Sequence, residues 1–341
     1  MIIDNYPSVS IVVIGHNEGN NLNSCFAAIN DMDYPKNKLE VIYVDSNSND
    51  KSSLLARNYT DKVVEIKSTW PTAGEAFNKG IMNASCEYVH ITAGDIKLHP
   101  AYLRTAINEL EHNEQIHAIT GYFIEKNNKG WNKILAYRRE EDSKQTHLVD
   151  TPNGGTFRKW TLQEVNGYDE RIKKGQETEI GLRFKERGFK ILHMNIPQGI
   201  HDFELNSLGD MLKRNWINGF SLGHLLLLSI FKPSKYLDKF KKSAIKQLLL
   251  SGGFIAILLL LLIYGGLKFI LVWLLFYILY FFMNVIIRQK HRTFNHKVYF
   301  LVNGYFSMIV FFGMLGFIVF FIRLRCENVN LMVNKKGLAQ N

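Results

Sequence analysis

Three long runs without a charged residue fill most of the last third of the sequence, at residues 248–267, 269–287 and 298–322. A helix that crosses a bilayer needs about 20 consecutive apolar residues. Buried helices of water-soluble proteins are the alternative, but these are rarely so long and apolar on every side. We therefore predict a membrane domain of two to three hydrophobic segments over residues 247–325, followed by a polar tail over residues 326–341.

The charge of the chain is distributed along the same division. From residue 232 onward, 15 Lys or Arg residues oppose two acidic residues, which gives +13, whereas the first 231 residues carry −3. A nucleic-acid-binding protein would carry its positive charge on the folded domain, so we expect no nucleic-acid partner. Basic residues beside apolar runs instead predict contact with a membrane surface.

The positions of Lys and Arg also predict an orientation. Basic stretches at residues 239–246 and 288–297 both lie in the cytoplasm if the first two apolar runs form a hairpin. A third full crossing would place Arg323 and Arg325 outside, against the positive-inside rule, so this glycine-interrupted run either crosses or re-enters. The N-terminal residues show no pattern of a secretory signal. We therefore expect residues 1–203 to form a cytoplasmic domain of a multi-pass protein in the cell membrane.

The segment between the two halves, residues 204–246, has an amphipathic pattern. Leu205, Leu208, Leu212 and Trp216 fall on one face of a helix. This pattern predicts helices that lie in the plane of the membrane interface. A core-facing helix of the soluble domain is the alternative interpretation.

The first 203 residues alternate between strand and helix patterns. Short apolar, β-branched runs predict strands at residues 9–14, 39–44, 63–66 and 88–91. Helical patterns lie between them, at residues 20–29, 52–58 and 74–84. This alternation is typical of right-handed βαβ units, so we predict an α/β fold with a mainly parallel sheet.

Acidic side chains gather where these predicted strands end. Asn17 and Glu18 follow the first strand, Asp45 the second and Asp95 the fourth. Ligands of parallel sheets bind beyond the carboxyl ends of the strands. Three carboxylates at one edge are costly unless a cation or a sugar hydroxyl is bound there.

Other common sites are disfavoured by the sequence. It contains neither GxGxxG nor GxxxxGK[ST], which argues against dinucleotide-binding and P-loop chemistry. Cys25, Cys86 and Cys326 are far apart, so neither a structural zinc site nor a disulfide framework is expected.

Six segments between residues 8 and 220 resemble, in order, the motifs of family 2 glycosyltransferases with a GT-A fold. They are residues 10–18, 41–52, 74–80, 92–95, 154–170 and 175–183. The resemblance implies a GT-A nucleotide-sugar-binding fold. The helix at residues 175–183 and the pair His201 and Asp202 resemble those of membrane-anchored bacterial enzymes of surface-polysaccharide assembly.

On the donor side, the resemblance implies that Asn17, Glu18 and Asp45 hold the nucleoside and that Lys79 faces the diphosphate. A solvated helix residue is the alternative for Lys79. Asp95 would bind Mg²⁺ or Mn²⁺, which prefer hard oxygen ligands. The chain departs from the family at Ala93, where the first Asp of a DxD motif is usual, so one metal-binding carboxylate is absent.

On the acceptor side, the resemblance implies that Glu177 is the general base, with Glu179 as an orienting second carboxylate. Glu177 lies near the start of a predicted helix, and this position favours its charged form. The remaining acceptor-side residues are Gly154, Gly155, His201 and Asp202, of which the glycines allow close backbone approach and the other two close the site.

The resemblance, together with the apolar runs, implies an inverting glycosyltransferase that moves a sugar from a nucleotide-sugar, with UDP as the default nucleotide, to a hydroxyl of a lipid-linked or saccharide acceptor. The reaction would take place at the cytoplasmic membrane face, in cell-surface polysaccharide or glycolipid synthesis. A polyprenyl-phosphate hexosyltransferase is a second hypothesis. A non-catalytic membrane scaffold with a degenerate GT-A domain is a third, supported by Ala93.

Overall fold

The computed structural model describes residues 6–68, 71–127, 132, 145–172, 175–201, 207 and 209–210. The chain divides into two units, Met1–Asp210 and Met211–Asn341, and every element below lies in the first. The predicted interfacial helices, but for three residues, and the three apolar runs lie outside the described residues. Within the described ranges, no helix is both long and apolar enough to cross a membrane.

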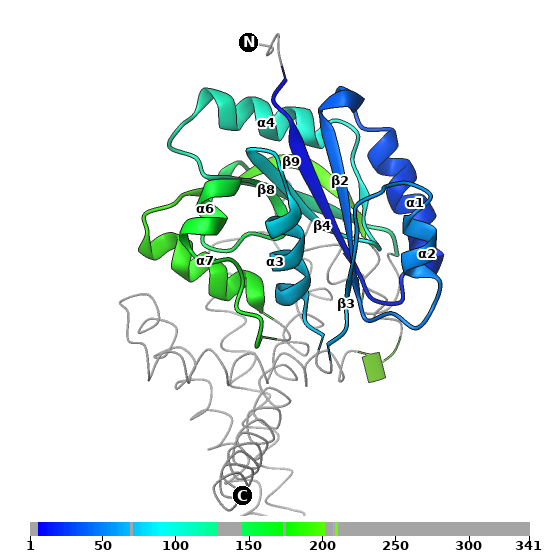
Figure 1. Cartoon of the computed structure of the whole chain (residues 1–341). Coiled ribbons are helices and arrows are strands. Elements are labelled where there is room, and N and C mark those ends of the chain that lie inside the picture. The colour runs from blue at the N-terminus through cyan, green and yellow to red at the C-terminus, as the bar shows by residue number, and fades with distance from the viewer. Residues whose placement is uncertain are drawn as a thin grey trace, which may run out of the picture. The chain divides into compact units, whose positions relative to one another are not determined.

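The described part of the chain forms one mixed sheet with helices on both faces (Figure 1). Its strands are β1 (Val9–Gly15), β2 (Leu39–Ser46), β3 (Val63–Ile66), β4 (Tyr88–Ala93), β5 (Lys97–Leu98), β6 (Ala118–Glu125), β7 (His147–Val149), β8 (Gly155–Arg158) and β9 (Ile191–His201). Its helices are α1 (Gly19–Asn30), the 3-10 turn Lys36–Lys38, α2 (Ser52–Ala56), α3 (Ala73–Asn83), α4 (Tyr102–His112), α6 (Lys159–Glu164) and α7 (Gln176–Glu186).

The first half of the sheet has the predicted parallel arrangement. The strand order begins β3-β2-β1-β4, and each neighbouring pair in it is parallel. The four predicted strands and three predicted helices are confirmed, although α2 ends at Ala56, earlier than expected. Short apolar β-branched runs therefore identified these strands correctly.

The second half of the sheet differs from the prediction of a mainly parallel sheet. Strand β8 is antiparallel to both β4 and β6, and β5 and β7 are antiparallel to β9. Only β6 and β9 are parallel in this half. The sheet is therefore mixed, because the pairing direction of a strand depends on the connection that delivers it and not on its hydrophobic period.

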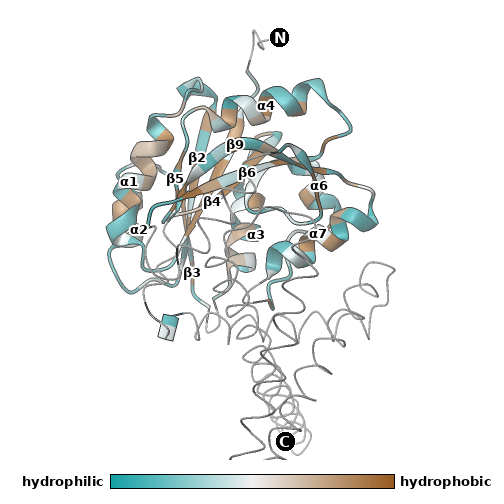
Figure 2. Cartoon of the chain, turned by 180° about the vertical axis from the view of Figure 1, so that it is seen from behind, coloured by the Kyte–Doolittle hydropathy of each residue, from teal (hydrophilic) through white to brown (hydrophobic). Residues whose placement is uncertain are grey.

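Two hydrophobic clusters cover the two faces of the sheet. Val9, Ile11 and Val13 of β1 pack with α1 and α4, while Val12 and Ile14 pack with α3, α6 and α7. Figure 2 shows this as hydrophobic residues along the central strands and mixed residues along the helices. Since both faces are covered, a polar ligand has to approach the sheet at an edge.

Candidate active site

Three chain segments meet at the carboxyl edge of the parallel strands. Gly15 at the end of β1 is paired with Asp45 on β2, and Ile14 is paired with Ala93 on β4. Beyond the strands, the Gly94 N–H donates to the Ile14 carbonyl at 2.8 Å. The structure thus places the turn after β1, Asp45 and the turn before Asp95 side by side.

Asp45 is buried, with 4% of its surface exposed. Its Oδ1 accepts a hydrogen bond from the Ser48 N–H at 2.8 Å. Its Oδ2 is also buried and has no hydrogen-bond partner among the described residues. A buried carboxylate oxygen without a donor is costly, so Asp45 is suited to accept from a ligand N–H or O–H.

Asn17 connects the turn after β1 to the loop after β2. Its backbone is left-handed, with φ of 59°, a conformation that Asn tolerates better than most residues. Its N–H donates to Ser48 Oγ at 2.9 Å, and its Oδ1 accepts from the Asn49 N–H at 2.9 Å. Asn17 therefore orders the loop that carries Asp45, and its predicted contact with a nucleoside stays a prediction.

Glu18 lies against the turn that leads to Asp95. A Cβ on Gly94 would come within 2.9 Å of Leu22 and 3.2 Å of the Glu18 Cβ, so only glycine fits there without a shift. The Glu18 N–H donates to Ser52 Oγ at 2.9 Å, and its Oε2 accepts from Asn21 at 2.8 Å. Glu18 is thus fixed at both its backbone and its carboxylate.

The pKa of a buried thiol, Cys25, is affected by the charges of Asp95 and Glu18. Cys25 of α1 is 1% exposed, and burial, followed by the charges of Asp95 and Glu18, raises its pKa to about 12. Cys25 is therefore an inert thiol at neutral pH. Its surroundings indicate that both carboxylates lie close to the same point of the fold.

Asp95 is paired with His201, the last residue of β9. His201 Nε2 and Asp95 Oδ2 are 3.0 Å apart, and the two side chains are 14% and 32% exposed. An ionised carboxylate only accepts hydrogen bonds, so Nε2 carries the hydrogen in this pair. Asp95 Oδ1 is buried without a partner among the described residues. Asp202, predicted to act with His201, lies outside the described residues.

The unpartnered Oδ1 of Asp95 allows a test of whether the site fits a divalent cation. A carboxylate oxygen is a hard ligand of the kind that Mg²⁺ and Mn²⁺ prefer. The described residues contain no group of three His, Cys, Asp or Glu side chains that could hold a metal. Asp95 therefore fits a cation for which the described residues supply few ligands, with His201 fixing the orientation of its carboxylate.

Ala93 packs against both hydrophobic clusters at the end of β4. The residue at this position therefore belongs to the apolar packing of the sheet. Beside it, the hydroxyl of Thr92 is buried without a hydrogen-bond partner among the described residues.

Glu177 and Glu179 both lie in the first turn of α7, which begins after Gly175 with φ of 88°. Glu179 is 7% exposed and bonds the guanidinium of Arg183, with Arg183 Nε at 2.7 Å from its Oε1. Arg183 also donates to the Val165 carbonyl and to the Gly167 carbonyl. Glu179 is thus held by an internal ion pair.

Glu177, the predicted base, is half-buried beside Tyr168. Burial and, after it, the charge of Glu177 raise the pKa of the Tyr168 phenol. The Tyr168 hydroxyl is buried and has no hydrogen-bond partner among the described residues. The role of Glu177 as a base stays a prediction, since no substrate atom is present to measure against.

Gly154 and Gly155 form the entry to β8, opposite the end of β4. Their φ angles are +67° and +111°, and a Cβ on Gly155 would lie 2.3 Å from the Ile119 carbonyl. Both positions therefore require glycine for the path of the backbone itself. This requirement is independent of any acceptor.

Lys79 is exposed on the face of α3 that is turned away from the sheet. The opposite face packs inward, where a Cβ on Gly80 would lie 2.1 Å from Val12. The arrangement is that of a solvated helix residue, and the predicted contact with a diphosphate stays a prediction.

The sequence interpretation missed Gln198, which is fully buried in β9. Its Oε1 accepts from Thr120 Oγ1 at 3.1 Å and from the Gly121 N–H at 3.0 Å, and its Nε2 donates to the Asn153 carbonyl at 3.3 Å. The signal available in the sequence was a Gln between Pro197 and Gly199 within a strand pattern. Because an amide is rarely buried without hydrogen-bond partners, a Gln in a buried strand indicates a hydrogen-bonded network.

Comparisons with known proteins agree with this arrangement. The sequence profile of Glycosyl transferase family 2 matches residues 10–165. The chain is 29% identical over 108 residues to Glycosyltransferase AglE of Haloferax volcanii, and 26% identical over 124 residues to Probable glycosyltransferase YdaM of Bacillus subtilis. These matches cover 30% and 34% of this chain, and 36% and 30% of the two relatives. The chain thus matches about a third of the length of each curated relative.

Solved structures share the fold at low sequence identity. The mannosyltransferase PcManGT of Pyrobaculum calidifontis, in complex with GDP-Man and Mn²⁺, matches with a TM-score of 0.61 at 15% identity, over 93% of this chain and 87% of that chain. S. aureus TarS 1-349 in complex with UDP-GlcNAc matches with a TM-score of 0.53 at 14% identity, over 70% of this chain and 71% of that chain. Residues 10–165 therefore match the glycosyl transferase family 2 model, and the described unit has the mixed α/β fold of GT-A glycosyltransferases.

Proposed function

We propose that the protein is an inverting glycosyltransferase that moves a sugar from a nucleotide-sugar to an acceptor hydroxyl. The observation that carries the proposal is the pair of unpartnered carboxylate oxygens, Asp45 Oδ2 and Asp95 Oδ1, at one edge of a family 2 domain. Both oxygens can accept a hydrogen bond or bind a cation, which are the interactions that a nucleoside diphosphate with its bound divalent cation offers.

The donor is proposed to be a nucleotide-sugar in which Asp45 accepts from the base or the ribose. The two solved neighbours are described in complex with GDP-Man and with UDP-GlcNAc, which supports a nucleotide-sugar without choosing the nucleotide. UDP is our default. Asn17 and Glu18 serve this site by ordering the loops on either side of Asp45 and Asp95.

The transfer needs a base for the acceptor hydroxyl and stabilisation of the leaving diphosphate. Glu177 would take the acceptor proton, since its place in the first turn of α7 favours a carboxylate. Asp95, oriented by His201, would hold Mg²⁺ or Mn²⁺. When bound, the cation neutralises negative charge on the diphosphate.

The acceptor is proposed to be lipid-linked or a saccharide, at the cytoplasmic face of the cell membrane. This rests on the three uncharged runs in the last third of the sequence and on the basic residues around them. We assign the protein on the same grounds to cell-surface polysaccharide or glycolipid synthesis.

The test is nucleotide release by the purified full-length chain. UDP-, GDP- and dTDP-sugars are offered with a crude lipid extract in Mn²⁺, Mg²⁺ or EDTA. Asp95→Ala and Glu177→Gln are compared with Asp61→Ala and with Glu186→Gln, an exposed carboxylate at the other end of α7. We expect metal-dependent release from one donor that both site variants lose and both controls keep.

Three other results would count against the proposal in different ways. Full activity of Glu177→Gln would refute the base and favour a lipid-phosphate acceptor, because a phosphate needs little help from a base. Unchanged release in EDTA would refute the role of the cation. Failure of the wild-type chain to bind any of the nucleotides by calorimetry would favour a non-catalytic scaffold.

A further inference from the structure

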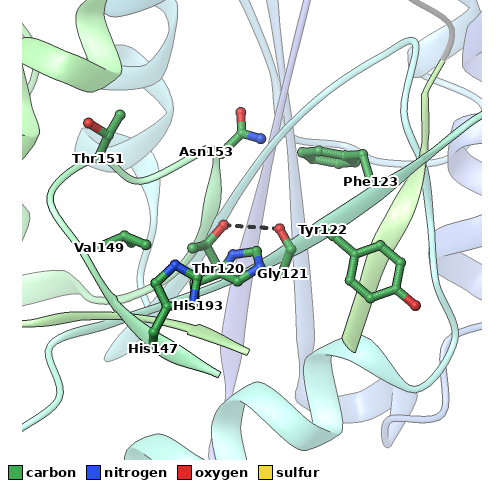
Figure 3. A pocket seen from close by; sticks show the side chains of 9 residues that line it. All are labelled: Thr120, Gly121, Tyr122, Phe123, His147, Val149, Thr151, Asn153 and His193. Atoms are coloured by element: carbon green, nitrogen blue, oxygen red, sulfur yellow. Dashed lines mark hydrogen bonds between the residues drawn. The ribbon is translucent and has the colours of Figure 1, made fainter. Parts of the chain in front are cut away.

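A pocket of about 160 Å³ lies where β6, β7 and β9 meet the segment at residues 151–153. Figure 3 shows its side chains, among them Thr120 and Tyr122 of β6, Asn153 and the imidazoles of His147 and His193. None of these residues was singled out by the sequence. The pocket is a separate hollow from the edge that carries Asp45.

The pocket adjoins the candidate active site by two contacts. Asn153 directly precedes Gly154, whose backbone lies against the Ile91 carbonyl near the end of β4. On another wall, the ring of Phe123 meets the ring of His201 edge-on, with centroids 5.9 Å apart, and His201 bonds Asp95. A ligand in this pocket would therefore be separated from Asp95, the group proposed to hold the cation, by the side chains of Phe123 and His201.

The lining chemistry favours an uncharged ligand. The nine residues that line the pocket include no Asp, Glu, Lys or Arg. They offer hydroxyl, amide and imidazole groups together with the aromatic side chains of Tyr122 and Phe123. A diphosphate would find no Lys or Arg side chain among them, and no group of three metal ligands occurs among the described residues. Hydroxyls of a neutral sugar, by contrast, match this mixture of donors and acceptors.

The size of the pocket limits the ligand to one small unit. Pockets for drug-sized ligands are usually about 300–1,000 Å³, so this one suits a single ring. A longer saccharide would have to extend out of it.

The wall of the pocket is held in place by Gln198. Its amide ties Thr120 and Gly121 of β6 to the Asn153 carbonyl, and it is 0% exposed. His193 is 8% exposed, and its ring lies 5.3 Å from the ring of His147. Such internal bonding keeps the polar groups arranged before a ligand arrives, which lowers the cost of binding.

We infer that this pocket binds one neutral sugar ring of the acceptor. The inference rests on the proposed glycosyltransferase function. Asn153 is its binding residue, because its carbonyl is held by Gln198 while its amide side chain lines the pocket (Figure 3). Gln198 is a positioning residue, since it acts through Thr120 and Asn153.

The test measures binding of simple sugars and of nucleotides to the same full-length protein. Methyl glycosides of glucose, mannose, galactose and N-acetylglucosamine are screened by saturation-transfer NMR against wild type, Asn153→Ala and Gln198→Met. Asn58→Ala is the matched control, as this exposed Asn follows α2 near the other end of the sheet. UDP and GDP binding is measured in parallel by calorimetry.

We expect at least one glycoside to give a signal that falls fivefold or more in Asn153→Ala and Gln198→Met and is unchanged in Asn58→Ala. Nucleotide affinity should stay within twofold in Asn153→Ala. If Gln198→Met does not fold, Asn153→Ala decides alone, since its side chain is exposed.

Two results would overturn the inference. One is the absence of any glycoside signal from a wild-type protein that binds nucleotide. The other is a signal that Asn153→Ala leaves unchanged. Absence of nucleotide binding would instead refute the proposed function, and a glycoside signal that depends on Asn153 would still support the pocket.

Discussion

At the scale of single residues, the site is defined by two carboxylates that each have one oxygen without a hydrogen-bond partner among the described residues. Asp45 and Asp95 each have one oxygen bonded within the fold and one oxygen buried without a partner among the described residues. Leaving a polar atom in this state costs about 1–3 kcal/mol. A ligand that supplies the missing donor or cation would recover that free energy, so the two positions are poised for binding.

Asp45→Asn tests this reading directly. The amide oxygen can still accept from the Ser48 N–H, so the loop should keep its structure, while the other atom becomes a donor. A hydrogen bond to a charged group contributes about 1.5–3 kcal/mol, so we expect the Kd of UDP or GDP to rise about tenfold to a hundredfold.

The measurement is isothermal titration calorimetry of the full-length chain with Mn²⁺. Asp61→Asn, an exposed carboxylate before β3, serves as the control. An unchanged Kd in Asp45→Asn would show that this oxygen does not face the nucleotide.

At the scale of elements, α7 is attached to the rest of the domain by Ile180 and Phe184, which are buried in the core, and by Arg183. Its guanidinium bonds Glu179 on the same helix and the carbonyls of Val165 and Gly167 in the turn after α6. The position of Glu177 thus depends on a neighbour two residues along the helix. This arrangement explains a second carboxylate in the first turn without giving it a chemical role.

Arg183→Met should therefore loosen α7. The change leaves Glu179, whose side chain is 9% exposed, without its partner, and breaking a buried pair costs about 3–5 kcal/mol. Lys185→Met is the matched control, because its partner Asp150 is 64% exposed and such pairs contribute about 0–1 kcal/mol. Hydrogen exchange of the α7 amides should be much faster in the first variant only. Equal exchange in both would contradict the proposed attachment.

The pairing of β4 with β8 makes the sheet sensitive to acid. His90 of β4 is fully buried against Thr156 of β8, at 3.0 Å from its Nδ1, and burial lowers its pKa from 6.5 to about 3. As the pH falls, His90 is therefore protonated in the unfolded chain before it is protonated in the folded chain. Stability is fully present above pH 6.5 and is lost as the pH falls from 6.5 toward 3, by about 1.4 kcal/mol per pH unit.

His90→Asn should reduce this dependence on pH. The opening free energy of β4 and β8, measured by hydrogen exchange between pH 6.5 and 4.5, should fall less steeply in this variant than in wild type. His112→Asn, at an exposed histidine of α4, should keep the wild-type slope. The same slope in all three proteins would rule out His90 as the source.

At the scale of the whole molecule, the folded domain and the membrane-like sequence have different physical characters. The described unit is held by two apolar clusters on either side of its sheet. The last third of the sequence is dominated by uncharged runs flanked by basic residues. The site lies at the edge of the sheet, where β1, β2 and β4 end.

Removal of divalent cations should accordingly affect ligand binding and leave folding unchanged. Within the described ranges no cluster of three metal-binding side chains supports the fold. We expect EDTA to leave the Tm of the ligand-free chain unchanged. Nucleotide with Mn²⁺ at a hundred times its Kd should stabilise the chain by about 2.7 kcal/mol, and EDTA should abolish that increase.

A fall in the Tm of the ligand-free chain on chelation would contradict this expectation, since it would mean that a resident metal supports the fold. Asp95→Ala provides the internal control. Its Tm should not respond to Mn²⁺ with nucleotide.

The sequence alone determined the parallel half of the sheet and the edge where polar residues gather. Strands such as β1 and β4 are buried and rich in β-branched residues, and this local signal does not depend on distant contacts. The order of Asn17, Glu18, Asp45 and Asp95 after successive parallel strands then placed them together, because parallel strands end at the same edge.

The tertiary structure decided what required partners distant in the sequence. The antiparallel entry of β8, the contacts of Arg183 with the Val165 and Gly167 carbonyls and the pocket around Gln198 all follow from which segments meet. Gln198 bonds residues 45 and 78 positions away. No local pattern encodes such a contact, because its stability comes from excluding water around a hydrogen bond that forms only once the sheet is complete.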